Sequence, residues 1–201
     1  TAVLGAALLI SGCGSSTNNE SSSSSKPEVL KVAANPVPHA EILEQVKPIL
    51  AKEGVDLQII EFTDYIQPNM ALSSHEVDAN FFANVPYQNN YNKDHGTNFV
   101  SFAPVHIEPL AIYSQKIKDL KDLPNGAKVA IPSDPTNSAR ALLLLQSAGL
   151  VTLKDPTGLT NTPFDVTSNP KNIQITELEA AQIPRSIQDL DAAVINANYA
   201  L

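Results

Sequence analysis

Several residue types are scarce in this 201-residue chain. It has no tryptophan and a single cysteine, and only 5% of its residues are aromatic. A single cysteine cannot form an internal disulfide, so the thiol needs another explanation. Glycine is also sparse, with 8 residues, whereas 15 prolines are present. That many prolines indicates frequent turns and argues against a bundle of long helices.

Positive charge and long apolar runs are lacking as well. The chain has 13 Lys and Arg against 21 Asp and Glu, which gives a net charge of −8. This acidic balance argues against a nucleic-acid partner, which requires a basic surface. No apolar run reaches the ~20 residues that a membrane-spanning helix needs. The composition, with 43% hydrophobic and 17% charged residues, is typical of a globular protein with one large or two small domains.

The motifs of common enzyme classes are missing too. The sequence contains no GxSxG, no P-loop, no GxGxxG and no second cysteine for a thiol site. The four histidines, His39, His75, His95 and His106, do not follow HExxH or another metal-ligand spacing. We therefore expect no catalytic residue, no cofactor and no metal site, and we interpret the histidines as scattered single residues. The alternative is a zinc or manganese site, which no spacing supports, with His39 or His106 as the histidines that could reach a cleft.

The only cysteine, Cys13, lies in a segment that looks like a secretion and anchoring signal. Residues 1–10 are apolar, Ser11 and Gly12 precede the cysteine, and residues 14–25 form a Ser/Asn tract. This order resembles the lipobox of bacterial lipoproteins, which implies cleavage before Cys13, acylation of its sulfur and a flexible tether. The alternative is a buried core cysteine. We expect residues 1–12 to be a signal-peptide remnant, residues 13–27 the lipidated tether, and the protein to be anchored on the extracytoplasmic face of the cell membrane.

The remainder of the chain shows a doubled β-α-β pattern. In the first unit, an apolar strand at 29–34 is followed by a helix that ends at Gly54 and a strand at 57–62. The second unit has strands at 128–132 and 173–176 around a helix at 135–148. Further helices are expected near 69–74, 85–92 and 117–123, and further strands at 78–82, 99–102, 107–113 and 192–196.

This pattern predicts an α/β fold with two lobes around a cleft. We place the first lobe at 28–112 and the second at 113–201. The sequence begins without an initiator methionine and stops where a helix is starting, so we interpret it as a fragment. The C-terminus is expected to be truncated, without the segment that would return to the first lobe.

A capped helix start carries the most specific polar pattern. Asp134 is a favourable N-cap, and Pro135 suits the first helical position. Asn137 and Arg140 are three residues apart, hence on one face of the helix. Together with the helix dipole, the guanidinium predicts a site for a carboxylate. A surface arginine beside a capped helix fits the same spacing.

Other candidate ligand-binding residues are aromatic or carry amides. Tyr65, Phe81, Phe82 and Tyr87 cluster in the sequence with polar residues that include Asn84, a mixture that suits a ligand pocket or ordinary core packing. Asn196 and Asn198 follow an apolar strand, where α/β proteins bind ligands. Glu108 lies in an apolar stretch and needs a cationic partner, either a ligand ammonium or an Arg or Lys side chain.

Taken together, these residues resemble the methionine-binding NlpA/MetQ lipoprotein family. The matching segments are DYIQPNMAL at 64–72, DANFFANVPY at 78–87, IEPLAIYSQKIK at 107–118, VAIPSDPTNSARALLLLQSAGL at 129–150 and AAVINANYA at 192–200. They follow the family's order over nearly all of residues 29–201. One departure is the Ala83-Asn84 pair, where relatives commonly carry Gln-His, and it leaves the side-chain preference open.

The resemblance implies a type II periplasmic-binding-protein-like fold that closes around L-methionine, D-methionine or a related amino acid or dipeptide. By position, Arg140 is implied to hold the ligand carboxylate, supported by Asn137. Asn196 and Asn198 are implied to bind the amino or carboxylate groups, and Tyr65, Phe81 and Tyr87 the side chain. The partners implied are an ABC permease and its ATPase. A metal-binding or adhesin-type surface lipoprotein is the alternative hypothesis.

Overall fold

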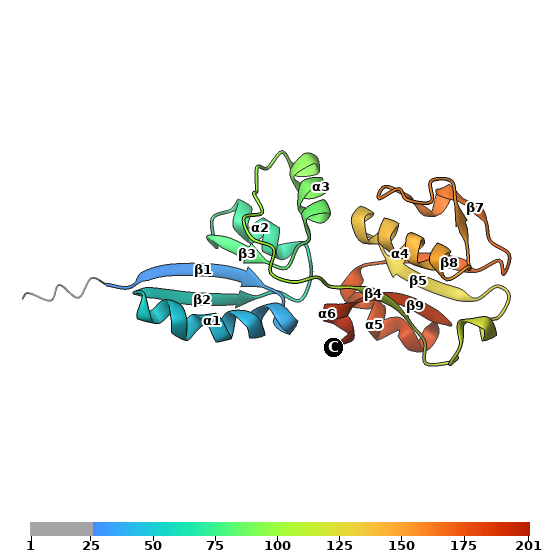
Figure 1. The fold of residues 1–201 in the computed structure, drawn as a ribbon, viewed down its shortest axis with the longest axis horizontal. Coiled ribbons are helices and arrows are strands. Elements are labelled where there is room, and N and C mark those ends of the chain that lie inside the picture. Colours follow the sequence, from blue (N-terminus) through green and yellow to red (C-terminus); the bar gives the residue numbers. More distant parts are fainter. Residues whose placement is uncertain (1–25) are drawn as a thin grey trace, which may run out of the picture.

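The described part of the chain is organised around two main sheets, with a third, two-stranded sheet beside them (Figure 1). The computed structural model describes residues 26–201, so Cys13, the lipobox-like segment and the Ser/Asn tract lie outside the described residues. The sheets and their helices form two lobes side by side, and the first lobe contains the start of the described chain.

The first lobe is built on a parallel three-stranded sheet. Strands β1 (Glu28–Ala34), β2 (Val55–Glu61) and β3 (Ala79–Phe81) pair in the order β2-β1-β3. The connecting helices are α1 (Glu41–Lys52), α2 (Gln67–Ser73) and α3 (Val85–His95). The predicted β-α-β unit is therefore present, with a π-helix at Pro36–Ala40 between β1 and α1.

The second lobe contains a mixed four-stranded sheet in the order β4-β9-β5-β8. Its strands are β4 (Leu110–Tyr113), β5 (Lys128–Pro132), β8 (Gln174–Leu178) and β9 (Ala192–Asn196), and only β4 is antiparallel to its neighbour. The expected boundary at 112/113 falls inside β4, all four residues of which pair with β9. Strands β6 (Thr152–Leu153) and β7 (Val166–Ser168) form a small antiparallel hairpin.

Helix α4 (Pro135–Ser147) is the longest described helix, with 13 residues. Two short helices, α5 (Ile183–Ser186) and α6 (Ala197–Ala200), flank β9 in the sequence. Single 3-10 turns occupy Leu120–Asp122, Pro163–Asp165, Ala180–Gln182 and Ile187–Asp189. Within residues 26–201, no helix has the length and apolar character required to cross a bilayer.

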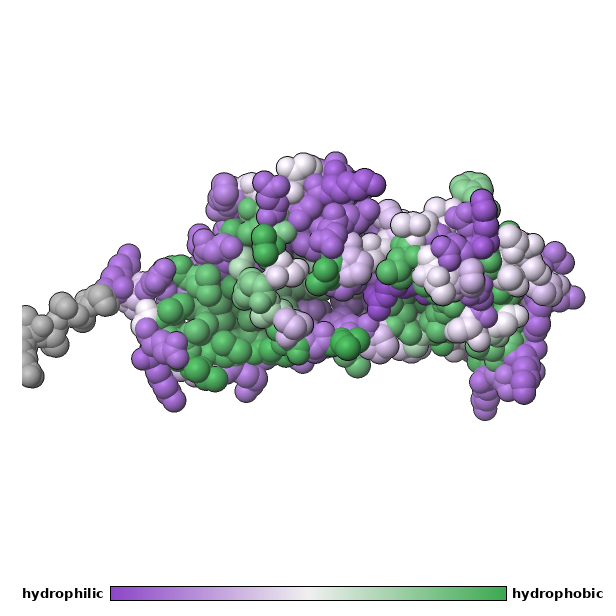
Figure 2. All heavy atoms as spheres, turned by 45° about the horizontal axis from the view of Figure 1, so that its top comes forward, coloured by the Kyte–Doolittle hydropathy of each residue, from purple (hydrophilic) through white to green (hydrophobic). Residues whose placement is uncertain are grey.

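The two lobes differ in how much apolar surface they bury. In the second lobe, Leu142 and Leu145 of α4 are fully buried against the β-sheet residues Val129, Ile131 and Val194. In the first lobe, α1 has no buried residue, and Ile49 on it is 56% exposed. Figure 2 shows apolar surface on the part of the molecule that holds β1, β2 and α1. The second lobe is therefore the better-packed support for a site.

The strand expected at 99–102 is absent, and the strand expected at 107–113 is shortened to β4. Val100, Phe102 and Ile107 are 81%, 86% and 93% exposed. The side chain of Asn92 hydrogen-bonds both backbone polar groups of Phe99: its Oδ1 accepts from the N–H at 3.0 Å, and its Nδ2 donates to the carbonyl at 2.8 Å. An apolar run forms a strand only when its backbone finds a partner strand, and among residues 26–201 this one finds none.

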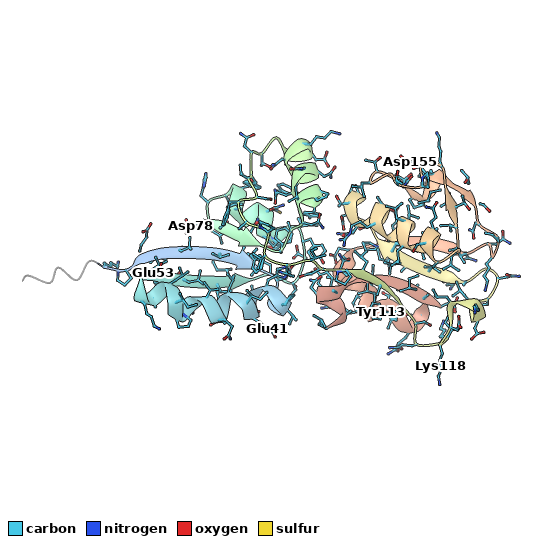
Figure 3. All side chains as sticks on the ribbon, in the orientation of Figure 1. Glu41, Glu53, Asp78, Tyr113, Lys118 and Asp155 are labelled. Atoms are coloured by element: carbon cyan, nitrogen blue, oxygen red, sulfur yellow. The ribbon has the colours of Figure 1, made fainter. Side chains whose placement is uncertain are left out.

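Side chains from distant parts of the chain meet where the lobes adjoin. The Tyr65 hydroxyl donates to Asn198 Oδ1 at 2.5 Å, and the Tyr199 hydroxyl donates to the Thr63 carbonyl at 3.1 Å. In Figure 3 side chains crowd this junction, whereas the labelled Glu53 and Asp155 project from surfaces away from it. The junction is thus closed by direct contacts between lobes.

Asp191, just before β9, fixes the start of neighbouring β5 and gives the fold a measurable acid sensitivity. Its carboxylate accepts the Lys128 N–H at 2.8 Å and contacts Lys116 Nζ at 3.1 Å. These interactions, the Lys128 N–H first, hold the pKa of Asp191 below its ordinary value of 3.8. A lowered folded pKa stabilises the protein above the unfolded pKa, and that stabilisation is lost as the pH falls through the folded pKa.

We therefore expect Asp191→Asn to lower the free energy of unfolding at neutral pH. In acid, the free energies of unfolding of the variant and the wild type should converge. Urea unfolding at about pH 7 and about pH 3, on either side of the ordinary Asp pKa, measures this. Asp189→Asn, two residues away and exposed, is the matched control. Parallel pH profiles for wild type and Asp191→Asn would contradict the assignment.

Candidate ligand-binding site

The start of α4 positions the polar half of the site. Asp134 follows β5, and its Oδ1 accepts the Asn137 N–H at 2.9 Å, as the N-cap prediction required. Pro135 occupies the first helical position, where a missing N–H costs nothing. The helix begins at the carboxyl end of a parallel strand, the edge at which α/β proteins place ligands.

Asn137 is the centre of a hydrogen-bond network. Its side chain is 2% exposed, and its Nδ2 donates to both Asp134 carboxylate oxygens, at 3.0 and 2.9 Å. Its Oδ1 accepts from Arg140 Nη1 at 2.9 Å and from Asn196 Nδ2 at 3.2 Å. The structure thus brings together Asn137, Arg140 and Asn196.

Arg140 is half-buried and has no carboxylate partner within residues 26–201. Its second donor, Nη2, binds the backbone carbonyl of Glu108 at 2.9 Å. Burial lowers the pKa of Arg140, and electrostatic interactions with Tyr65, Asp134 and Glu108 oppose that shift. A guanidinium nevertheless stays protonated in proteins. A partly desolvated cation held by neutral groups is suited to an incoming anion.

Three aromatic rings stand beside this network. The centroid of the Tyr65 ring lies 5.9 Å from that of Phe82 and 6.0 Å from that of Tyr87, and Phe82 and Tyr87 are 5.7 Å apart. The Tyr87 hydroxyl donates to the Tyr65 carbonyl at 2.8 Å. Burial raises the pKa of both tyrosines, so their hydroxyls remain protonated. The rings form an apolar wall with fixed polar edges.

A small hollow separates the aromatic wall from the polar network. It has a volume of about 20 Å³ and is lined by Tyr65, Phe82, Ala83, Asn84, Tyr87, Asn137 and Asn196. Asn84 also caps α3, accepting the Tyr87 N–H at 2.9 Å. Asn196 Oδ1 is buried there with no hydrogen-bond partner among the described residues. This volume holds roughly one water, so an amino acid requires the lobes to move apart.

Four predicted residues do not line the hollow. Arg140 and Asn198 contact its lining residues Asn137 and Tyr65, whereas Phe81 and Glu108 lie elsewhere. The Phe81 ring packs edge-on against two histidines, with its centroid 4.8 Å from that of His39 and 5.6 Å from that of His106. It does not line the hollow. The Glu108 carboxylate, for which we expected an Arg, a Lys or a ligand ammonium, contacts these same two histidines. Among residues 26–201, the only arginine contact of Glu108 is through its backbone carbonyl. Sequence reasoning treated His39 as a single residue that could reach a cleft, and it did not pair this histidine with Glu108.

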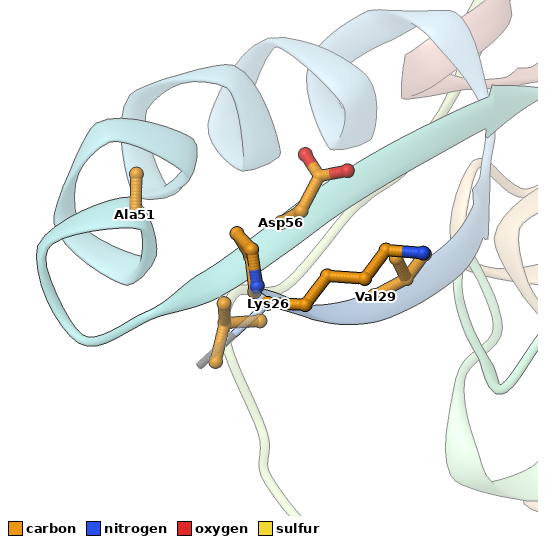
Figure 4. A pocket seen from close by; sticks show the side chains of 6 residues that line it. Lys26, Val29, Ala51 and Asp56 are labelled. Atoms are coloured by element: carbon orange, nitrogen blue, oxygen red, sulfur yellow. The ribbon is translucent and has the colours of Figure 1, made fainter. Parts of the chain in front are cut away.

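A larger hollow, about 250 Å³, lies at the opposite end of the first lobe (Figure 4). It is lined by Lys26, Pro27, Val29, Ala51, Val55 and Asp56. The charged side chains, Lys26 and Asp56, are both exposed. Because it lacks buried, convergent polar groups, it does not qualify as a specific ligand site.

Comparison with known proteins now defines the family. A family model described as NlpA lipoprotein matches residues 30–201. The chain belongs to the NlpA lipoprotein family. The resemblance stated from the sequence is thereby confirmed, and membership of a lipoprotein family supports a lipid-anchored location at a membrane.

Relatives of this NlpA lipoprotein include a curated protein and solved structures. The D-methionine-binding lipoprotein MetQ of Salmonella typhimurium is 43% identical over 197 residues, which cover 96% of this chain and 70% of the relative. A nutrient binding protein from Burkholderia cenocepacia bound to methionine is 48% identical, with a TM-score of 0.81 over 85% of this chain and 73% of that one.

An ABC-transporter periplasmic substrate-binding protein from Coxiella burnetii is 44% identical, with a TM-score of 0.80 over 85% of this chain and 72% of that one. The prediction of an α/β, two-lobed binding-protein fold is confirmed by these likenesses. The three relatives named here are binding proteins rather than enzymes.

Proposed function

We propose that this chain captures methionine between its two lobes, as the substrate-binding lipoprotein of an ABC importer. The observation that carries the proposal is Arg140, a half-buried guanidinium fixed by Asn137 and the Glu108 carbonyl but paired with no carboxylate in the described chain. The names of relatives at 43% and 48% identity support methionine as the ligand.

Each part of a zwitterionic amino acid has a suitable partner. Arg140 offers a two-pronged grip on the carboxylate, while the Oδ1 atom of Asn196, buried without a partner, suits the ammonium group. The rings of Tyr65, Phe82 and Tyr87 suit a thioether, because sulfur packs favourably against aromatic edges. Asn198 acts indirectly in this proposal, by holding the Tyr65 hydroxyl.

Ligand entry in this proposal requires an opening of the lobes. The hollow between the network and the rings is far smaller than an amino acid, and contacts such as Tyr65–Asn198 close it. We infer that the lobe before β4 and the lobe from β4 onward, residues 110–201, act as the two halves of a clamp, hinged where the chain crosses between them. Binding then shifts an equilibrium between open and closed forms.

Delivery follows from the same proposal. Cys13 carries the lipid, residues 13–27 tether the clamp to the extracytoplasmic face of the membrane, and a permease with its ATPase accepts methionine from the closed form. The tether allows the clamp to search the space next to the permease, which raises their effective concentration.

Titration calorimetry on the full chain tests the ligand. A Cys13→Ser version, which cannot be acylated, is titrated with L-methionine, D-methionine, a methionyl dipeptide and leucine. We expect saturable binding in the micromolar range or tighter for a methionine species, and much weaker binding of leucine, which lacks the sulfur. Absence of binding to every amino acid and dipeptide would overturn the proposal.

A further inference from the structure

Three side chains of types that bind metals converge beside the junction of the lobes: His39 comes from the turn after β1, and His106 and Glu108 come from one segment far from it in the sequence. His39 Nε2 lies 3.1 Å and His106 Nε2 2.6 Å from the same Glu108 carboxylate oxygen, Oε1. One ligand atom from each of the three residues lies within 4.8 Å of the others. Neither the ligand-binding proposal nor any enzyme motif uses this cluster.

The cluster is held in place by its surroundings. The side chain of His39 is 3% exposed, and its ring packs against Phe81 at 4.8 Å and lies 5.2 Å from the ring of His106. The Glu108 backbone is fixed by Arg140, which binds its carbonyl. Ligands with restricted rotamers lose little entropy when an ion binds, so the arrangement is preorganised.

The chemistry of the contacts is unusual for a purely structural cluster. Two imidazole nitrogens face one carboxylate oxygen, and no Lys or Arg side chain within residues 26–201 pairs with that carboxylate. Two nitrogen lone pairs and one carboxylate oxygen form a donor set preferred by borderline divalent ions such as Zn²⁺.

We propose that His39, His106 and Glu108 bind a divalent transition-metal ion, with Zn²⁺ as the probe. Ligand atoms about 2.0–2.2 Å from zinc stand roughly 3.4 Å apart in a tetrahedral site. The two carboxylate contacts, 3.1 and 2.6 Å, therefore need to widen by about 0.3 Å and about 0.8 Å. His106 and Glu108, whose side chains are 26% and 21% exposed, have the freedom to make that adjustment.

This site is separate from the hollow that we assign to methionine and does not rest on that assignment. Three protein ligands leave at least one coordination position for water. A bound ion would fasten the turn after β1, which carries His39, to the segment that crosses between the lobes, which carries His106 and Glu108.

Zinc binding to the chelator-treated full chain tests the proposal. The Cys13→Ser version removes the thiol as a competing ligand, and calorimetry with Zn²⁺ is paired with the visible absorption of bound Co²⁺. We expect one ion per chain, with intense Co²⁺ bands of a low-coordinate site. His106→Asn should weaken binding by about 100-fold or more, since loss of even an outer-shell partner costs 10–100-fold.

His75→Asn is the matched control. His75 is exposed and has a φ of 60°, a conformation that asparagine tolerates, so this variant removes an imidazole without strain. Glu108→Gln, which keeps the side-chain shape, is the second test variant and should also weaken binding. The proposal is overturned if the wild type takes up no zinc, or if His106→Asn and Glu108→Gln bind it as tightly as His75→Asn.

Discussion

Arg140→Ala is expected to weaken methionine binding by about 2–5 kcal/mol, roughly 30- to 5,000-fold, as loss of one partner of a desolvated charge pair does. The guanidinium is the only cation that we place against the ligand carboxylate, and its removal leaves that carboxylate without a charged partner in a closed site. Asn137 and the Glu108 carbonyl also lose their arginine donors.

Calorimetric titration with L-methionine measures the effect. Arg185→Ala is the control, because it removes the same charge from the exposed surface of α5. The expected pattern is near-wild-type affinity for Arg185→Ala and a large loss for Arg140→Ala. Equal affinities in the two variants would show that the ligand carboxylate binds elsewhere, even if methionine binding itself persists.

Asn137→Ala should destabilise the fold by about 2–4 kcal/mol, because net hydrogen-bond contributions near 1 kcal/mol are joined by the desolvation of unpaired groups. Arg140 and Asn196 each lose an acceptor, and Asp134 loses the Nδ2 donor. All of these atoms lie around a residue that is 2% exposed, so water cannot freely replace the lost partner.

Urea unfolding and thermal melts quantify this change, for which a domain of this size should lose roughly 4–15 °C in Tm. Asn89→Ala, an exposed asparagine on α3, is the control and should leave the melt nearly unchanged. If Asn137→Ala retained wild-type stability, the network would not be the structural support that its distances indicate. Methionine affinity should fall in parallel, since Arg140 loses its orienting contact.

Local spacing was sufficient to predict the polar half of the site. Asn137 and Arg140 meet because residues three apart share a helix face, and Asp134 caps the helix that carries them. Asn196 joins them because β5 and β9 are parallel neighbours, so their carboxyl ends lie at one edge. The β-α-β pattern predicted β5 and the apolar run at 192–196 predicted β9, although neither predicted that the two strands are adjacent.

Contacts between distant segments could not be predicted in this way. No sequence spacing relates His39 to His106 and Glu108, because the fold alone brings them together. Phe81 and Phe82 looked equivalent in the sequence, yet neighbours in extended chain point to opposite faces. Phe82 therefore lines the hollow, while Phe81 packs against the histidines. The 99–102 segment has the apolar composition of a strand, but the Asn92 side chain hydrogen-bonds the backbone N–H and carbonyl of Phe99.

The location of β9 bears on how the protein is synthesised. This strand lies between β4 and β5, both of which leave the ribosome much earlier, so the sheet of the second lobe lacks an interior strand until residues 192–196 have been synthesised. Until β9 arrives, β4 and β5 present unpaired edges, which are prone to aggregation. Asn196 ends that same strand. A nascent chain therefore gains Asn196, to which we assign ligand recognition, in the same step that completes the sheet.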